Sequence, residues 1–346
     1  MSHIELGLDT FGDVTAQPDG TASSYAQVIR EVVEQAVVAD QTGVDFIGLG
    51  EHHRDDFAIS SPEMVLAAIA GQTTRIRLGS AVTVLSSDDP VRVFQRFATL
   101  DAVSNGRAEI ILGRGSFTES FPLFGFELSQ YEQLFEEKLE LFAELLTEQA
   151  VTWTGQTRAA LAGQEVFPKT ESGSLKTWIG VGGSPESVVR TASYGLPLML
   201  AIIGGEAARF APYVDLYHRA LAQFEKPARP IGIHSPGFVA DTDEQARDIL
   251  WPHYSVMRDR IGRERGWPVM TMAEFDSEIE SGSLYVGSPE TVARKIARSI
   301  VALGADRFDL KYSAGPLEHK HLVHGIELYG TRVIPLVREL VAEASA

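Results

Sequence analysis

Segments typical of buried strands alternate with amphipathic helices along almost the whole chain of 346 residues. Between the strand candidates, apolar residues recur about every 3.6 positions, as in helices packed on a sheet. Such alternation predicts parallel βα units, and eight units favour an α/β fold of the closed (β/α)8 TIM-barrel type over a doubly wound sheet. The strand candidates are residues 4–10, 45–50, 76–84, 109–113, 178–182, 196–203, 231–240 (interrupted at Pro236) and 307–312.

Two stretches interrupt this alternation. Residues 148–176 hold two short strand candidates, 151–153 and 165–167, among polar turns, and we interpret them as an excursion from the barrel. Residues 265–287 are polar and irregular, and loops of that length inside a domain are usually functional lids or disordered. Because no linker or shift of composition divides the chain, we predict a single domain over residues 1–346.

Charge and composition argue against several classes of protein. The formal net charge is −17, with acidic residues spread along the chain, which disfavours nucleic acid or an anionic membrane as a partner. Without cysteine, the chain forms no disulfide, thiolate nucleophile or cysteine-ligated metal centre. The amino-terminus lacks the features of a signal peptide, and no apolar stretch reaches about 18 residues, so we expect a cytoplasmic protein.

Titratable residues directly follow the second strand candidate, in Gly50-Glu51-His52-His53. If the strand persists, alternation directs His52 into the barrel beside the glycines. The alternatives are a solvated loop and a metal site, although the sequence lacks His-Glu-x-x-His and a second ligand cluster. The carboxyl ends of all strands of such a barrel meet at one face. The side chains predicted to converge there are Glu51, His52, Ser80, Arg114 and Ser184.

A glycine-rich turn joins the fifth strand candidate to a helix, in Gly180-Val181-Gly182-Gly183-Ser184. Glycines let the backbone approach a ligand, and the free N–H groups of a helix start bind anions, phosphate above all. Arg114 at a neighbouring strand end would add a guanidinium. The alternative is a tight turn with a serine cap and nothing bound. The run lacks the lysine of a Walker motif and the last glycine of a dinucleotide fingerprint.

Two further patterns carry less information. His234 stands alone near a strand, and we interpret it as a hydrogen-bonded structural histidine. No Gly-x-Ser-x-Gly elbow is present, so serine hydrolysis has no support in the sequence.

Over nearly its whole length the chain resembles the bacterial luciferase-like flavin-dependent monooxygenases. The resemblance implies a TIM-type barrel that binds reduced FMN, which reacts with O2 to a flavin hydroperoxide that oxygenates a small organic substrate. A separate NAD(P)H–flavin reductase would supply the reduced FMN, and a homodimer is the family expectation. Light emission is not implied, because the luciferases have a reactive cysteine near the site. The matching blocks are Gly50-Glu51-His52-His53, residues 75–82, residues 101–115, residues 179–197 and residues 325–330.

The resemblance also assigns residues by position. His52 matches the catalytic histidine, which would take and return a proton near the flavin–oxygen adduct. Glu51 would lie near the flavin, and Ser80-Ala81-Val82 along its ring, with Ala81–Val82 as the candidate for a non-proline cis peptide. The stretch 265–287 matches a mobile loop. The residues that would hold the FMN phosphate or lie beside it are Arg114, Ser116, Gly182, Gly183, Ser184 and Ser187.

Two alternatives to the monooxygenase remain open. A deazaflavin-dependent oxidoreductase of the same superfamily would transfer hydride without oxygen, and the Glu-His-His run makes it the less favoured reading. A non-catalytic flavin-binding protein would keep Arg114 and Ser184 but would not need His52. The identity of the substrate is not specified by these motifs.

Overall fold

The structure, a computed structural model, describes residues 4–115 and 117–344. Eight parallel strands follow one another around a closed barrel, in which the last strand pairs again with the first. The predicted (β/α)8 barrel is therefore confirmed. In order around the barrel the strands are β1 (Glu5–Thr10), β2 (Phe46–Leu49), β3 (Arg77–Ser80), β5 (Ala108–Gly113), β8 (Lys176–Val181), β9 (Leu198–Ala201), β10 (Ile231–Val239) and β12 (Arg307–Lys311).

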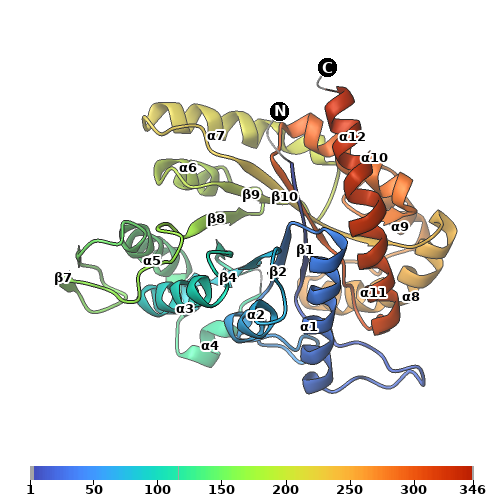
Figure 1. Ribbon diagram of the computed structural model, residues 1–346, viewed down its shortest axis with the longest axis horizontal. Coiled ribbons are helices and arrows are strands. Elements are labelled where there is room, and N and C mark those ends of the chain that lie inside the picture. The colour runs from blue at the N-terminus through green and yellow to red at the C-terminus, as the bar shows by residue number, and fades with distance from the viewer. Residues whose placement is uncertain (1–3, 116, 345–346) are drawn as a thin grey trace.

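Helices surround the strands (Figure 1). Their apolar faces pack on the outward side chains of the strands, such as Leu8 and Ile47, which are fully buried. Serine caps predicted from sequence are present at Ser24 and Ser184, whereas Ser61 precedes its helix without a capping hydrogen bond. No helix within the described residues is both long enough and apolar enough to span a bilayer. The helices are α1 (Tyr25–Thr42), α2 (Pro62–Ala70), α3 (Pro90–Val103), α4 (Ser120–Phe124), α5 (Tyr131–Leu145), α6 (Pro185–Ser193), α7 (Ala211–Gln223), α8 (Asp243–Arg265), α9 (Met272–Ser281), α10 (Pro289–Leu303), α11 (His319–Leu328) and α12 (Ile334–Ala344).

Two of the predicted strands have different limits in the structure. The third is divided into β3 and β4 (Thr83–Val84), and the peptide Ala81–Val82 between them is cis, as predicted. The seventh, β10, runs unbroken through Pro236, so the predicted interruption is wrong. Pro236 lies where one edge of β10 passes from pairing with β9 to pairing with β11 (Tyr285–Gly287), a place where the missing N–H breaks no ladder.

The prediction that residues 265–287 are irregular is also wrong. Helix α9 lies inside this stretch and begins with a capping box between Thr271 and Glu274. Phe275 is fully buried, with its ring 5.1 Å from Trp251 and 5.6 Å from Tyr254 between centroids. This one apolar anchor holds a helix whose remaining residues are mostly polar and therefore show little periodicity. A lid function for the stretch stays a prediction.

The excursion after α5 is a small antiparallel pair at the edge of the molecule (Figure 1). Its first strand, β6 (Val151–Trp153), is as predicted, but its partner is β7 (Leu161–Gln164) and not residues 165–167. That segment instead lies against α3, where Gln95 donates a hydrogen bond to the carbonyl of Phe167 at 2.8 Å.

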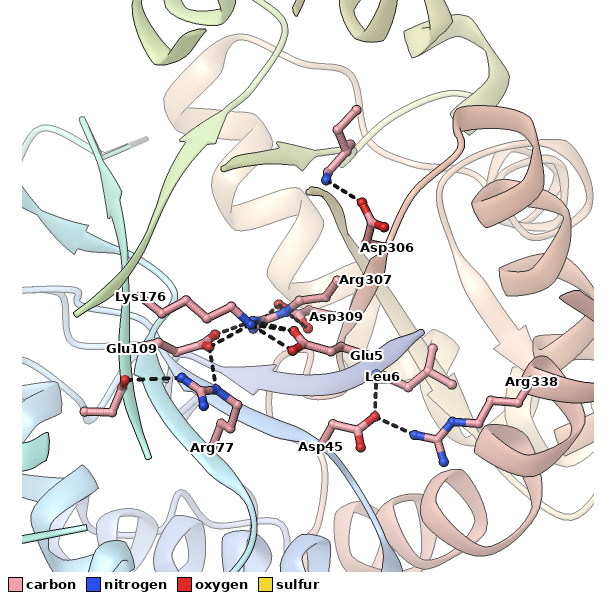
Figure 2. Close-up of polar contacts among 12 residues, drawn as sticks. Glu5, Leu6, Asp45, Arg77, Glu109, Lys176, Asp306, Arg307, Asp309 and Arg338 are labelled. Atoms are coloured by element: carbon pink, nitrogen blue, oxygen red, sulfur yellow. Dashed lines mark hydrogen bonds and ion pairs between the residues drawn. The ribbon is translucent and has the colours of Figure 1, made fainter. Parts of the chain in front are cut away.

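Paired charges fill the amino-terminal end of the barrel (Figure 2). The Arg307 guanidinium is fully buried and forms ion pairs with Glu109 and Asp309. Lys176 and Arg77 approach Glu109 at 3.4 and 2.9 Å. Burial alone would raise the pKa of Glu109, but Arg307, Lys176 and Arg77 outweigh it and lower the pKa to about 2. This end of the barrel is closed by charges that neutralise one another.

Above these charges the barrel holds one apolar layer and then small residues. The layer contains Phe46, Ile111, Trp178 and Met199, with Ala81 beside them. Because side chains alternate along a strand, the next inward position on each of these strands is two residues further on. Those positions are Gly48, Gly113, Gly180 and Ala201. Towards its carboxyl-terminal end the barrel interior is thus lined by small residues, against which Ala81 and Val82 pack.

Candidate active site

The residues predicted to converge lie on one rim of the barrel. Val84 pairs with Gly113 across the sheet, and its N–H donates to the Glu51 carboxylate at 3.0 Å. Glu51 directly precedes His52, and Gly113 directly precedes Arg114. The histidine and the arginine therefore occupy the same end of the barrel, as the sequence predicts.

The turn between β8 and α6 forms a cradle for an anion. Gly183 has φ +107°, and a Cβ added to Gly182 would meet no atom within 4 Å. Ser184 caps α6 by accepting the N–H of Ser187 at 3.3 Å. The Ser187 hydroxyl is buried without a hydrogen-bond partner among the described residues. Since buried hydroxyls are nearly always hydrogen-bonded, this one could donate to a ligand bound at the start of α6.

Arg114 supplies positive charge beside this cradle. Its guanidinium lies 5.4 Å over the ring of Tyr131 and forms an ion pair with Glu132. The hydroxyl of Ser184 lowers the pKa of the exposed Glu186, and the charges of Arg190 and Arg114 add to this effect. Arg114 is therefore close enough to the start of α6 to act on it electrostatically.

Val82, which follows the cis peptide, lies beside glycines of two neighbouring strands. The Val82 side chain points into the barrel, because a Cβ added to Gly113 or Gly180 would lie 2.6 or 3.2 Å from its methyl groups. Val82, Gly180 and Ala201 are partly exposed although they point inward, so this exposure is through the rim. Val82 is one of the three residues, Ser80-Ala81-Val82, that the resemblance placed along the cofactor ring. The cis peptide redirects the chain, and strand parity could not predict that.

Ser80 lies in the wall of the barrel. It is fully buried, donates to the carbonyl of Ile111 at 3.2 Å and accepts from the Thr83 hydroxyl at 2.8 Å. Both hydrogen bonds stabilise the break between β3 and β4, and direct contact between Ser80 and a cofactor stays a prediction. Ser116, another predicted site residue, lies outside the described residues.

His52 is held in a box of aromatic rings. The centroids of Phe57, Phe11 and Phe117 are 4.6, 4.7 and 5.1 Å from the centre of its imidazole. Its Nδ1 lies 3.7 Å from the Glu119 carboxylate, beyond hydrogen-bond distance. The ring is thus fixed by packing while its nitrogens remain available. The aromatic residues come from three separate loops, and no local sequence signal marks them.

Glu51 and His53 form a second pair beside it. His53 Nε2 and Glu51 Oε1 are 2.9 Å apart, and the other carboxylate oxygen accepts the N–H of Val84. The pair therefore holds the segment after the cis peptide in place. Direct contact between Glu51 and a cofactor stays a prediction. The described residues include no group of three or more histidine, aspartate or glutamate side chains that could hold a metal ion.

The geometry fits a flat molecule with a phosphate tail. Arg114, the free Ser187 hydroxyl and the start of α6 suit the phosphate, and the space beside Val82 and Gly180 suits a planar ring. Arg190, one turn after Ser187, is an addition to the predicted set. It pairs with Glu136 at 2.7 Å and with Glu132 at 3.5 Å. Its spacing from Ser187 on one helix face was visible in the sequence.

Comparisons with known proteins point in the same direction. A curated relative, N-acetyl-S-alkylcysteine monooxygenase from Bacillus subtilis (strain 168), is 26% identical over 297 residues, which are 81% of this chain and 85% of that protein. The structure of monooxygenase RslO1 from Streptomyces bottropensis matches with a TM-score of 0.81 at 22% identity, over 96% of this chain and 99% of that one.

Two other solved structures share the fold but differ in cofactor. The oxygenating constituent of 3,6-diketocamphane monooxygenase from Pseudomonas putida, in complex with FMN, has a TM-score of 0.77 at 18% identity, covering 97% of this chain and 99% of that one. The coenzyme F420-dependent tetrahydromethanopterin reductase from Methanopyrus kandleri has a TM-score of 0.72 at 17% identity, covering 96% and 99%.

The family comparison covers most of the barrel. The model described as luciferase-like monooxygenase matches residues 10–307, from the end of β1 to the start of β12. The match includes both halves of the rim described above, the segment after β2 and the turn into α6. This chain belongs to the luciferase-like monooxygenase family.

Proposed function

We propose that this chain is a monooxygenase that takes up reduced FMN and uses O2 to oxygenate a small organic substrate. A separate NAD(P)H–flavin reductase would supply the reduced flavin. The observation that carries the proposal is the buried, unpartnered hydroxyl of Ser187 in an anion cradle on the same rim as His52.

The chain's own groups suffice to hold the cofactor. The Arg114 guanidinium, the Ser187 hydroxyl and the positive end of the α6 dipole would bind the phosphate. Val82 and Gly180 would lie along the ring. When bound, reduced FMN supplies the electrons with which O2 is activated. Glu132, which is exposed and pairs with Arg114, would give way to the phosphate.

His52 would act as the proton acceptor and donor at the reacting end of the site. An imidazole titrates near neutral pH and can both accept and return a proton. The rings of Phe11, Phe57 and Phe117 keep water away from it and fix its orientation. The carboxylate of Glu119 lies 3.7 Å from its Nδ1.

The second candidate is hydride transfer with a deazaflavin. It is favoured by the fold that this chain shares with an F420-dependent reductase. FMN is favoured by the FMN-bound structural neighbour and by a curated relative that is itself a monooxygenase. The phosphate cradle suits either cofactor, so the two candidates are separated by a binding experiment.

The experiment is an anaerobic titration with reduced FMN and with reduced F420, followed by mixing with O2. We expect tight binding of reduced FMN and weak binding of F420, and the reverse result would establish the deazaflavin reading. For His52→Ala we expect flavin affinity to persist while oxygenation of a model sulfide or ketone falls by about 10²-fold or more. His324→Ala, at an exposed position on α11, is the matched control.

Each negative result of this experiment leads to a different conclusion. Binding of neither cofactor would refute a flavin function. Binding of reduced FMN with equal reactivity in the His52→Ala variant would leave a flavin-binding protein without the proposed catalytic histidine. We also infer, from the resemblance alone, a homodimer in the cytoplasm, which sedimentation velocity and cell fractionation would test.

A further inference from the structure

One large polar side chain stands among the small residues above the apolar layer. On β10, Gly232 lies against this layer, since a Cβ added to it would be 2.5 Å from Met199 and 3.4 Å from Trp178. His234, two residues further on, therefore also points inward. Its neighbour across the sheet is Ala201. Where β2, β5, β8 and β9 provide glycine or alanine, β10 places an imidazole, beside the charged side chains of β1 and β12.

A buried carboxylate holds this imidazole from behind. His234 Nδ1 and Asp9 Oδ2 are 2.8 Å apart, and Asp9 is fully buried. The other oxygen, Asp9 Oδ1, has no hydrogen-bond partner among the described residues. The His234 side chain is 13% exposed. Asp9 engages Nδ1, which leaves Nε2 as the ring nitrogen for another partner.

The pair lies close to the proposed catalytic histidine. The ring of Phe11 stacks nearly parallel to His234, with centroids 6.5 Å apart, and meets His52 edge-on at 4.7 Å. Phe11 therefore contacts both imidazoles, one inside the barrel and one at its rim. The site has two histidines in different environments, with a carboxylate hydrogen-bonded only to the deeper one.

The charged neighbours of His234 lie on the two strands β1 and β12. From β1 it faces Asp9, and from β12 it faces Asp309 and Lys311. Asp309 pairs with Arg307, and Lys311 with Asp13 at 3.0 Å, so these neighbours are largely neutralised. Burial alone would lower the pKa of His234, but Asp9, with help from Asp309, outweighs burial and the opposing charge of Lys311 and raises it.

We propose that the Asp9–His234 pair forms the base of the flavin site and selects the reduced flavin over the oxidised one. The inference rests on the proposed function, because it requires a flavin ring above this pair. A reduced isoalloxazine readily loses a proton near neutral pH and becomes an anion, whereas the oxidised ring is neutral. In a low-dielectric site, a protonated imidazole backed by a carboxylate attracts the anion far more than the neutral ring. An enzyme fed by a separate reductase needs this preference.

The test compares dissociation constants for reduced and oxidised FMN, measured anaerobically, in the wild type and in His234→Gln. We expect the wild type to prefer reduced FMN and the variant to lose about tenfold or more of its affinity for that form, with oxidised FMN little changed. Asp9→Asn keeps the imidazole but removes its counter-charge, and we expect part of the same loss. His324→Gln, an exposed histidine paired with Asp241, is the control.

A second readout uses the protein without flavin. Proton NMR of the histidine ring should show His234 titrating above the ordinary value of about 6.5, and Asp9→Asn should lower that midpoint. Equal weakening of both flavin forms in His234→Gln, or an unchanged ratio, would overturn the inference and leave His234 a structural residue. If the wild type binds neither form, it is the proposed function that fails.

Discussion

Charged residues at the two ends of the barrel differ in the partners that they have within the chain. At the amino-terminal end, Arg307 and Glu109 are fully buried and neutralise each other within the chain. At the carboxyl-terminal end, Arg114 has only an exposed carboxylate as its ion-pair partner, and the Ser187 hydroxyl has no hydrogen-bond partner among the described residues. The difference indicates that the first end is completed by folding, whereas the second is where we propose that a ligand binds.

Exposure shows why the two kinds of ion pair differ in strength. Arg114 is 26% exposed and its partner Glu132 57%, so their pair contributes about 0–1 kcal/mol. A pair without exposure is not screened by water, and removal of one partner leaves an uncompensated buried charge. Substitutions at the amino-terminal end should therefore act on stability, and those at the carboxyl-terminal end on binding.

The largest expected effect is on the folding of Arg307→Met. This change leaves Glu109 and Asp309 buried without their main cation, and we expect a loss of about 3–5 kcal/mol in the free energy of unfolding. Urea denaturation followed by circular dichroism measures it. Arg332→Met, in an exposed pair with Glu290, is the control and should cost about 1 kcal/mol or less. Equal losses in the two variants would contradict the comparison.

The same end of the barrel should make the stability of the fold sensitive to acid. In the folded chain the pKa of Glu109 is about 2, whereas its ordinary value is 4.5. Between these values the unfolded chain binds more protons, so stability falls as the pH falls. We expect the stability advantage of the wild type over Glu109→Gln to shrink by about 3 kcal/mol between about pH 5 and pH 2. An advantage that is independent of pH would contradict this role for Glu109.

At the other end, Arg114→Met should weaken binding and spare the fold. Loss of a charged partner for phosphate should lower the affinity for FMN by about 10- to 100-fold. The free energy of unfolding without ligand should change by about 1 kcal/mol or less, because only an exposed pair is lost. Fluorescence titration and urea denaturation on the same sample separate the two effects. A variant that binds FMN normally but unfolds easily would show that Arg114, like Arg307, serves stability and not binding.

The smallest effect is expected for Ser187→Ala. One neutral hydrogen bond to the phosphate is worth about 0.5–1.5 kcal/mol, so affinity for FMN should fall about two- to tenfold. Because the hydroxyl is unpartnered in the structure, its removal should leave the stability of the free protein unchanged or slightly raised. Ser193→Ala, on the same helix, is the control for binding. A clear loss of stability in Ser187→Ala would show that the hydroxyl has a partner within the chain.

The fold and the outline of the site could be predicted from sequence because both follow from local rules. Strand and helix periodicity gave the eight βα units, and the position of residues after strand ends brought Glu51, His52, Arg114 and Ser184 to one rim. The cap at Ser184 followed from the serine–proline start of α6. These features depend on neighbours a few residues apart.

The rest could not be predicted because it depends on distant contacts or on breaks in the local rules. Strand parity fails at the cis peptide before Val82, which turns that side chain inward. The polar stretch around Phe275 forms a helix that apolar periodicity does not predict, because mainly one buried ring anchors it. Asp9 and His234 meet only because β1 and β10 both flank β12 in the closed barrel. For this reason His234, alone in the sequence, was interpreted as structural.

The most direct test of the central claim is the difference in affinity between reduced FMN and reduced riboflavin, which lacks the phosphate. If the cradle of Arg114, Ser184 and Ser187 binds phosphate, the wild type should bind FMN at least about tenfold more tightly, and Arg114→Met should remove most of that advantage. Equal affinities for the two flavins in the wild type would contradict the account.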